Sequence, residues 1–405
     1  MPAALAVVGV LLAIRFVWKR RESVRKMSGR TMALLLFGIA VAGMVVTAWW
    51  LKKRQNKAVA FQMQVEKQRH AERLALIEAT RHGDLIALVG DVLEAVSADL
   101  DQSAERVLRE VTISRIAALT YALKPYYMVE MEGNQRGKER PNQSGMSEKV
   151  WSPERGYLLL ALANMDIDSA SFRAVKATAS FADADLRKAN LRGRDLSGAD
   201  LRGAGFKHAD MHQVNLSDAD LTDAQLWGAH LDSANLRRAD FTRADLRWTE
   251  ANHADFRHAL LNGADLSNAH MRHADFRKSE IKWASTDGAL LHHANLACVN
   301  MLGTHFIKTH LHSAHLLEAN LRMTDMTDAY LPNAELTRVA VDKNWVEKME
   351  EWGLKDRAAV SKAYEVVPDT SGRFRYATFC LHKLGDVAEI LVPEKDPEES
   401  LEPQN

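Results

Sequence analysis

From residue 179 to residue 341 the chain repeats one pattern of apolar and polar positions every five residues. Counting from Phe181 in steps of five, 33 centres follow without a slip, and 29 of them are Leu, Phe or Met. The residue two places before the centre is Ala in 24 of the 33 repeats, and Asp or Asn often stands between the two. A period of five matches neither a continuous helix nor a continuous strand. Each repeat must therefore combine a short extended side with a turn.

Residues two apart in an extended chain share one face, so the Ala and the central residue of each repeat both point inward. The other three positions face water, and stacked coils bury a continuous ladder of central side chains. The predicted core includes Phe181, Leu186, Leu191, Leu196, Leu201, Phe206, Leu221, Phe241, Phe256 and Phe276.

The repeats resemble those of the pentapeptide-repeat family, whose pattern is A(D/N)LXX, as in Ala184-Asp185-Leu186 and Ala189-Asn190-Leu191. The resemblance implies a right-handed quadrilateral β-helix, a mainly β solenoid with four repeats and twenty residues per coil, and so about eight coils. Arg194 stands at an Ala position, and because a buried unpaired cation is costly, we expect a local bulge there.

Two apolar runs precede the soluble body of the chain. A helix needs about 20 apolar residues to cross a bilayer, so residues 31–51 are long enough and residues 2–18 are marginal. No basic residue precedes the first run and no small-residue cleavage site follows it, which argues against a cleaved signal peptide. We expect residues 1–54 to be a membrane anchor of one or two transmembrane helices. The partner of this segment is then the lipid bilayer.

The flanks of the solenoid resemble those of membrane-anchored bacterial members of the family, notably Trp151-Ser152-Pro153-Glu154-Arg155-Gly156. This resemblance implies the bacterial inner (plasma) membrane. Basic residues between the two runs favour a cytoplasmic loop there, but Lys52 and Lys53 after the second run favour the opposite topology. The side on which the soluble body lies therefore stays open.

The remaining sequence divides by composition and periodicity. We expect a helical region over 55–130, a linker and lead-in over 131–164, the β-helix over 165–341 with an early repeat at Ala170 and Phe172, a C-terminal cap over 342–392, and an acidic tail over 393–405. Within the cap, residues 344–352 and 355–364 are predicted to be helices and 373–379 a strand. We expect the cap because a solenoid end exposes apolar surface.

Composition excludes several classes of function. Lys plus Arg equals Asp plus Glu, at 53 each, so a general nucleic-acid binder is not expected. Cys298 and Cys380 lie far apart and predict neither a disulfide framework nor a metal site. No phosphate-binding, metalloprotease or nucleophile-elbow motif occurs, so we predict no enzyme and no cofactor. Histidines are frequent in the repeats, but rungs about 4.8 Å apart on a flat sheet suit tetrahedral metal binding badly.

If one coil is twenty residues, surface residues twenty apart form rows. The candidate interaction surface consists of two neighbouring basic and histidine-rich rows: Arg237, Arg238, Arg257, His258, Arg277 and Lys278 in one, and His253, Arg272, His273, His292 and His293 in the other. A third row carries Asp200, Asp220 and Asp240. These rows are either solvated polar positions neutralised by neighbours such as Asp255 and Asp275, or a docking strip for an acidic protein or anionic lipid. Stacked imidazoles would also resist joint protonation, which makes a pH-responsive surface a further hypothesis.

Two functions stay in competition. The first is a non-catalytic, membrane-anchored scaffold that binds an unidentified protein partner. The second is the inhibition of a topoisomerase by mimicry of DNA, which is known for some members of the family. Mimicry needs a surface dominated by negative charge, whereas residues 179–341 hold 21 acidic and 18 basic residues.

Overall fold

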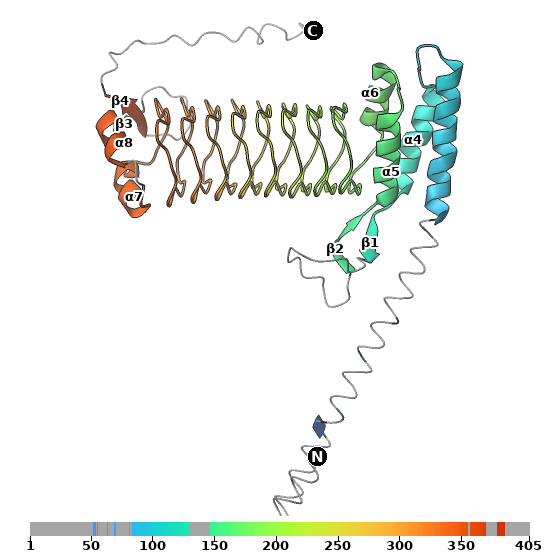
Figure 1. The fold of residues 1–405 in the computed structure, drawn as a ribbon, viewed down its shortest axis with the longest axis horizontal. Helices are drawn as coiled ribbons and strands as arrows, with labels where there is room; N and C mark the ends of the chain where they lie inside the picture. Colours follow the sequence, from blue (N-terminus) through green and yellow to red (C-terminus); the bar gives the residue numbers. More distant parts are fainter. Residues whose placement is uncertain are drawn as a thin grey trace, which may run out of the picture. The chain divides into compact units, whose positions relative to one another are not determined.

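The computed structural model describes residues 83–129, 146–354, 357–369 and 379–384, with a few isolated positions before residue 82 (Figure 1). The chain divides into two units, and the solenoid and both of its caps belong to the unit formed by Thr80–Glu130 and Met146–Asn405. The two apolar runs, residues 2–18 and 31–51, lie outside the described residues, as does the acidic tail. Within the described part, no helix combines the length and apolarity needed to span a membrane.

The helical region contains one helix over residues 83–102 and a second, α4, over Glu110–Ala122. Val89 and Val96 of the first helix and Ile116 of α4 are fully buried, as the apolar stripe predicts. The region ends in β1, Tyr126–Val129, which pairs antiparallel with β2, Met146–Trp151. The sequence pattern did not reveal this two-stranded sheet, because most of the predicted linker separates its strands.

Two helices lead into the solenoid: α5, Pro153–Asn164, and α6, Ser169–Thr178. Helix α6 begins where the Asp168 carboxylate accepts hydrogen bonds from the amides of Ala170 and Ser171, at 2.9 and 3.0 Å. The expectation of an early repeat at Ala170 and Phe172 is therefore wrong, as is a β-helix that starts at residue 165. The first inter-coil bridge is at Ser180.

From Ser180 onward, parallel bridges join residues twenty apart, beginning with Ser180 to Asp200 and Asp185 to Gly205. The repeat centred on Leu226 shows the bonding pattern. The amides of Gln225, Leu226 and Gly228 donate to carbonyls of adjoining coils at 2.9, 2.7 and 2.9 Å. The amide of Ala229 closes the turn on the Leu226 carbonyl at 2.8 Å. Four such turns complete one coil, so each coil has four corners.

All 33 central residues are buried, and none exposes more than 3% of its surface. They stack in four columns, one per corner, and in one of them the rings of Phe256 and Phe276 lie parallel with centroids 4.6 Å apart. Thr replaces Ala or Leu at several inward positions, and these hydroxyls bond inside the wall. Thr309 Oγ1, for example, donates to the Thr286 carbonyl at 2.7 Å. Most buried hydroxyls in proteins have such a partner, and the inward Ser279 hydroxyl is an exception here.

Arg194 causes no bulge, contrary to expectation. The Asn215 amide still donates to the Arg194 carbonyl at 2.9 Å, and the Asp195–Asn215 bridge follows in register. The side chain is only half-buried. Residue 174, which would underlie it in a preceding coil, belongs to α6, so Arg194 sits at the end of the column rather than inside it.

The N-terminal end of the solenoid is covered by the segment before α5. Ser152 forms a parallel bridge with Ala184 and exchanges hydrogen bonds with Asp183 O and Asp185 N at 2.8 and 3.1 Å. The buried guanidinium of Arg155 donates to the Thr120 carbonyl at 2.9 Å and to the Ala182 carbonyl. These bonds join α4, α5 and the first coil.

The C-terminal end is covered by α7, Trp345–Glu351, α8, Arg357–Ala363, β3, Tyr364–Pro368, and β4, Phe379–Lys383. Strand β4 pairs with β3 and with the last coil, where Leu381 N and O bond to Val339 and Arg338 at 2.8 Å each. Most of the predicted strand over 373–379 lies outside the described residues, and β3 was not predicted. Cys298 and Cys380 are both free thiols.

Gly156 of α5 allows the closest approach between the N-terminal cap and the solenoid. A Cβ atom at this position would lie 2.1 Å from the Asp185 carbonyl oxygen, which is far inside van der Waals contact. We expect Gly156→Ala to lower the free energy of unfolding by about 1–3 kcal/mol, because backbone must move to relieve the overlap.

The matched control is Gly90→Ala, in the helix over residues 83–102, where an added Cβ meets no atom within 4 Å. This change should be neutral or stabilise by about 0.5–1 kcal/mol. Thermal unfolding followed by circular dichroism measures both variants. An equally stable Gly156→Ala protein would contradict the packing of α5 on the first coil.

Candidate interaction surface

Three outward positions of each repeat form rows along the solenoid. Two belong to the corner itself: the residue after the centre, and the next residue, which has a positive φ. The third precedes the centre and lies on the flat side, where it forms the inter-coil bridge. The twenty-residue coil therefore brings the predicted surface residues into columns.

The arginine corner consists of Arg237, Arg238, Arg257, His258, Arg277 and Lys278. Its cations are paired with carboxylates of the same surface. Arg257 lies 2.6 Å from Asp255, Arg277 lies 2.7 Å from Asp275, and Arg238 lies 2.6 Å from an oxygen of Asp218. Ion pairs at these exposed positions add little stability, but they neutralise the row. This half of the predicted surface therefore supports the interpretation as a solvated, self-neutralised face.

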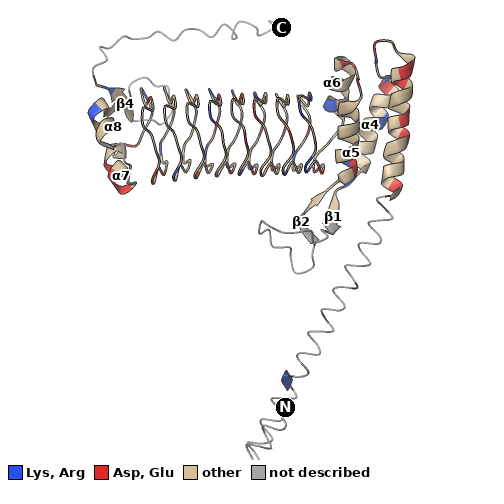
Figure 2. Ribbon diagram, in the orientation of Figure 1, with Lys and Arg blue, Asp and Glu red and all other residues tan. Residues whose placement is uncertain are grey.

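The same pairing recurs elsewhere as an Asp-x-Arg tripeptide. Arg202 bonds Asp200 at 2.8 Å and approaches Asp220 at 3.6 Å, so the predicted acidic row is also interrupted by a cation. Arg247 pairs with Asp245 at 2.7 Å in the same way. Figure 2 marks both signs of charge along the same coils. The neutralisation of the rows by Asp255 and Asp275, one of the two interpretations offered by the sequence, agrees with these ion pairs.

The histidine corner consists of His253, Arg272, His273, His292, His293 and His312. The rings of His253, His273 and His293 stack with centroids 4.9 Å apart and planes within 3° of parallel. His312 meets His293 edge-on at 5.5 Å. The structure thus brings the predicted histidine row together and adds His312, which the sequence reasoning left out.

Burial and neighbouring positive charge disfavour protonation on both corners. Burial, followed by Coulomb repulsion from His253 and His293, lowers the pKa of His273. Burial, followed by His310 and Arg272, lowers the pKa of His292. Burial and then Lys278 and nearby arginines lower the pKa of His258. No group of three or more His, Cys, Asp or Glu side chains in the described part of the chain is placed to hold a metal ion.

Large apolar side chains also occupy corner positions, which the sequence analysis did not single out. Trp248, Trp283 and Met323 each expose more than half of their surface. The Trp283 ring covers Gly303 of the next coil, where a Cβ would lie 2.2 Å from the indole. A glycine twenty residues after an aromatic residue is the sequence signal for this packing.

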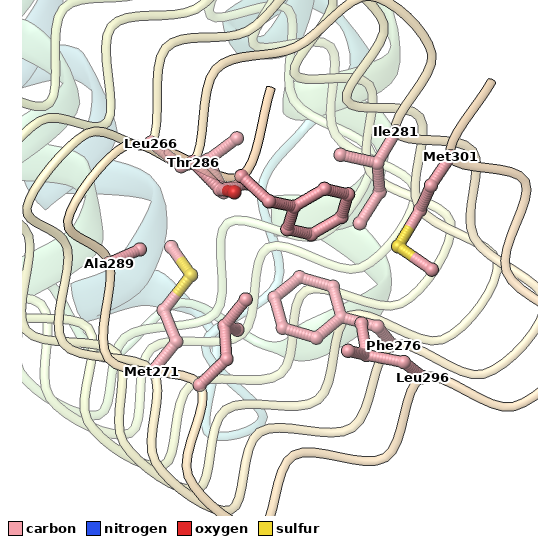
Figure 3. A pocket seen from close by; sticks show the side chains of 10 residues that line it. Leu266, Met271, Phe276, Ile281, Thr286, Ala289, Leu296 and Met301 are labelled. Carbon is pink, nitrogen blue, oxygen red and sulfur yellow. The ribbon is translucent and has the colours of Figure 1, made fainter. Parts of the chain in front are cut away.

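The cavity found inside the described coils is too small for a ligand. A cavity of about 10 Å³ lies among apolar residues of the core, including Leu266, Phe276 and Met301 (Figure 3). Thr286 lines this cavity, and the other central residues of its column are larger. Its hydroxyl donates a hydrogen bond to the His305 carbonyl at 2.8 Å. A space of this volume suffices for about one water molecule at most.

The lowered histidine pKa values predict how stability depends on pH. In the unfolded chain these imidazoles titrate near an ordinary pKa of about 6.5, so below that pH the unfolded state binds more protons than the folded state. The stabilisation is complete above about pH 6.5 and is lost as the pH falls toward the lower folded values. We expect the midpoint of thermal unfolding to fall by a few degrees between about pH 7.5 and pH 5.5, above the range in which carboxylates protonate.

His273→Asn should reduce this fall, because Asn tolerates a positive φ and does not titrate. Ser233→Asn, in the same column, should leave the fall unchanged. A midpoint that rises on acidification would show that the histidines gain protons on folding.

Comparison with known proteins agrees with this geometry. The family model described as pentapeptide repeats matches eight copies, over residues 179–218, 219–257, 252–285 and 287–322. A search of curated proteins found no match.

One similar solved structure is that of HetL, a pentapeptide repeat protein involved in heterocyst differentiation regulation from the cyanobacterium Nostoc sp. strain PCC 7120. It is 27% identical, over 42% of this chain and 85% of HetL, with a TM-score of 0.25. QnrB1, a plasmid-mediated fluoroquinolone resistance protein, is 18% identical over 40% of this chain and 95% of its own, with a TM-score of 0.22. A pentapeptide repeat protein from the Arabidopsis thaliana thylakoid lumen is 21% identical over 31% of this chain and 75% of its own, with a TM-score of 0.13. The solenoid of this chain is therefore built from pentapeptide repeats, which the family model matches within residues 179–322.

Proposed function

We propose that this chain is a non-catalytic scaffold that is anchored in the bacterial inner membrane and presents the sides of its solenoid to a protein partner. Pentapeptide-repeat proteins are generally non-enzymatic interaction modules. The membrane part of the proposal is supported by the apolar run over residues 31–51, which has the length of a bilayer-spanning helix.

The observation that carries the proposal is the occupation of both solenoid ends by the chain itself. Ser152 and α5 cover the first coil, and β4 continues the hydrogen bonding of the last coil. Stacking onto another solenoid through an exposed end is therefore blocked at both ends. The four sides and corners are the surface that remains for a partner.

The alternative, topoisomerase inhibition by DNA mimicry, is not favoured by the described surface. A DNA mimic needs continuous negative charge. Here the aspartates of the flat sides are joined to arginines of the neighbouring corners, as in the pairs of Asp200 with Arg202 and Asp255 with Arg257.

Site-specific photo-crosslinking in isolated membranes tests the proposal. A photoreactive residue is placed at each corner of one coil, at positions 268, 273, 278 and 283, and at Lys362 of α8 as a control on the end cap. We expect a discrete protein adduct from one or two adjacent corners and none from position 362.

The same experiment on a chain that lacks both apolar runs, residues 2–18 and 31–51, tests the anchor. This deletion should move the chain from the membrane pellet to the supernatant, and single deletions of the two runs show which of them anchors it. Adducts from the end cap alone, or retention of the shortened chain in the membrane, would contradict the proposal.

A further inference from the structure

Over the coils from residue 252 to residue 313, the histidine corner carries no carboxylate at its turn positions; the nearest one on this corner, Asp232, belongs to the preceding coil. Between residues 252 and 313 its turn positions are Asn252, His253, Arg272, His273, His292, His293, His312 and Ser313. The side chain of Arg272 makes no ion pair among the described residues, in contrast to Arg257 and Arg277 on the arginine corner.

The acidic residues that border this corner are already engaged. On one flat side, Glu250 lies 2.9 Å from His230. On the other, Asp255 and Asp275 are held by Arg257 and Arg277. In the preceding coil of the corner itself, the Asp232 carboxylate accepts from the Asn252 amide at 2.7 Å.

The remaining titratable neighbours are also histidines. His310, on the flat side, packs against His292 with ring centroids 5.5 Å apart, and His270 lies on the same side two coils earlier, beyond Leu290. His315, on the opposite side, is bound to Glu335 at 3.2 Å. Protonation of the corner therefore adds positive charge that no carboxylate of the described surface neutralises.

The geometry of the corner excludes two kinds of ligand. A zinc ion needs nitrogen ligands about 2.0–2.1 Å away that converge on one point, whereas parallel rings 4.9 Å apart project side by side. His253, His273 and His293 are exposed on a convex corner, so no enclosed pocket is present for a small molecule. An extended or flat anionic surface is the shape that reaches several of these rings at once.

We propose that the histidine corner is a docking surface for an acidic segment of a protein partner, and that this segment binds more tightly as the pH falls below neutrality. The proposal rests on the scaffold function above, since it names the chemistry of the partner. Neutral imidazoles leave only Arg272 charged, whereas imidazolium groups offer a row of donors to carboxylates.

Binding and protonation are coupled on this corner. His273 lies between two imidazoles with ring centroids 4.9 Å away, whose positive charge would repel its own, and a carboxylate placed over the row offsets that repulsion. The partner therefore raises the histidine pKa values, and affinity rises as the pH falls through the pKa of the bound state.

The test measures the binding of poly-L-glutamate to the full-length protein in detergent by isothermal titration calorimetry. We expect binding to be at least about tenfold tighter near pH 5.5 than near pH 7.5, because about one further proton is taken up on binding. The triple variant His253→Asn, His273→Asn, His293→Asn should reduce this pH dependence, and the part that remains is due to His292 and His312. Asn tolerates the positive φ of all three positions, and thermal unfolding verifies that the variant is folded.

The matched control replaces an exposed corner histidine outside both candidate rows, His208→Asn, and should bind as the unchanged protein does. Arg272→Gln gives a second, independent test: it should weaken binding at both pH values and keep the pH dependence. Equal affinity at the two pH values, or a triple variant that behaves like the control, would overturn the proposal. So would tight binding of inorganic polyphosphate or of anionic phosphatidylglycerol vesicles without binding of poly-L-glutamate.

Photo-crosslinking separates this proposal from the scaffold function. Specific adducts from a corner of the solenoid combined with no binding of poly-L-glutamate would leave the scaffold in place and reject the acidic partner. If neither a corner adduct nor binding of poly-L-glutamate is observed, the scaffold function itself is rejected.

Discussion

Every corner of this solenoid depends on one residue with a left-handed backbone conformation. Between residues 183 and 338 the second residue after each centre, at the corner, has a positive φ. At 25 of these positions the residue is not glycine. Each of these residues accepts a strain of roughly 1–2 kcal/mol relative to a right-handed conformation. The strain persists because three amides of a typical repeat bond to adjoining coils, as around Leu226, so no residue can relax without breaking the ladder. The left-handed residue also turns its side chain outward, which creates the surface columns.

The interior and the coil length could be predicted from the sequence because they depend on local preferences that recur in every repeat. Phe256 and Phe276 are both central residues, and their stacking follows once twenty residues complete a coil. The capping elements could not be predicted in this way. Helix α6 interrupts an apparent repeat because Asp168 provides a helix cap, and strand β4 forms against β3 and the last coil. Arg194 was misjudged because the pattern does not show that its column begins there.

The candidate surface could be predicted in composition but not in electrostatic character. Both rows combine Arg and His at the same turn positions. They differ in the residues that precede the centre: Asp255 and Asp275 pair with the arginine corner, whereas His270 stands at that position before His273. The neutral formal charge of the chain therefore conceals one corner whose cations are not balanced locally.

The account as a whole requires that residues twenty apart are neighbours. Disulfide formation between introduced cysteines measures this directly, after Cys298 and Cys380 are replaced by Ser. Asn215 and Asn235 form one of the parallel bridges, with their side-chain amides 2.9 Å apart. The pair Asn215→Cys and Asn235→Cys should therefore oxidise readily, since bridged residues fall within the Cα separation of about 4.4–6.8 Å that a disulfide needs. The pair Asn215→Cys and His230→Cys, fifteen residues apart, should stay reduced; its oxidation, with no cross-link at twenty, would contradict the four-cornered coil.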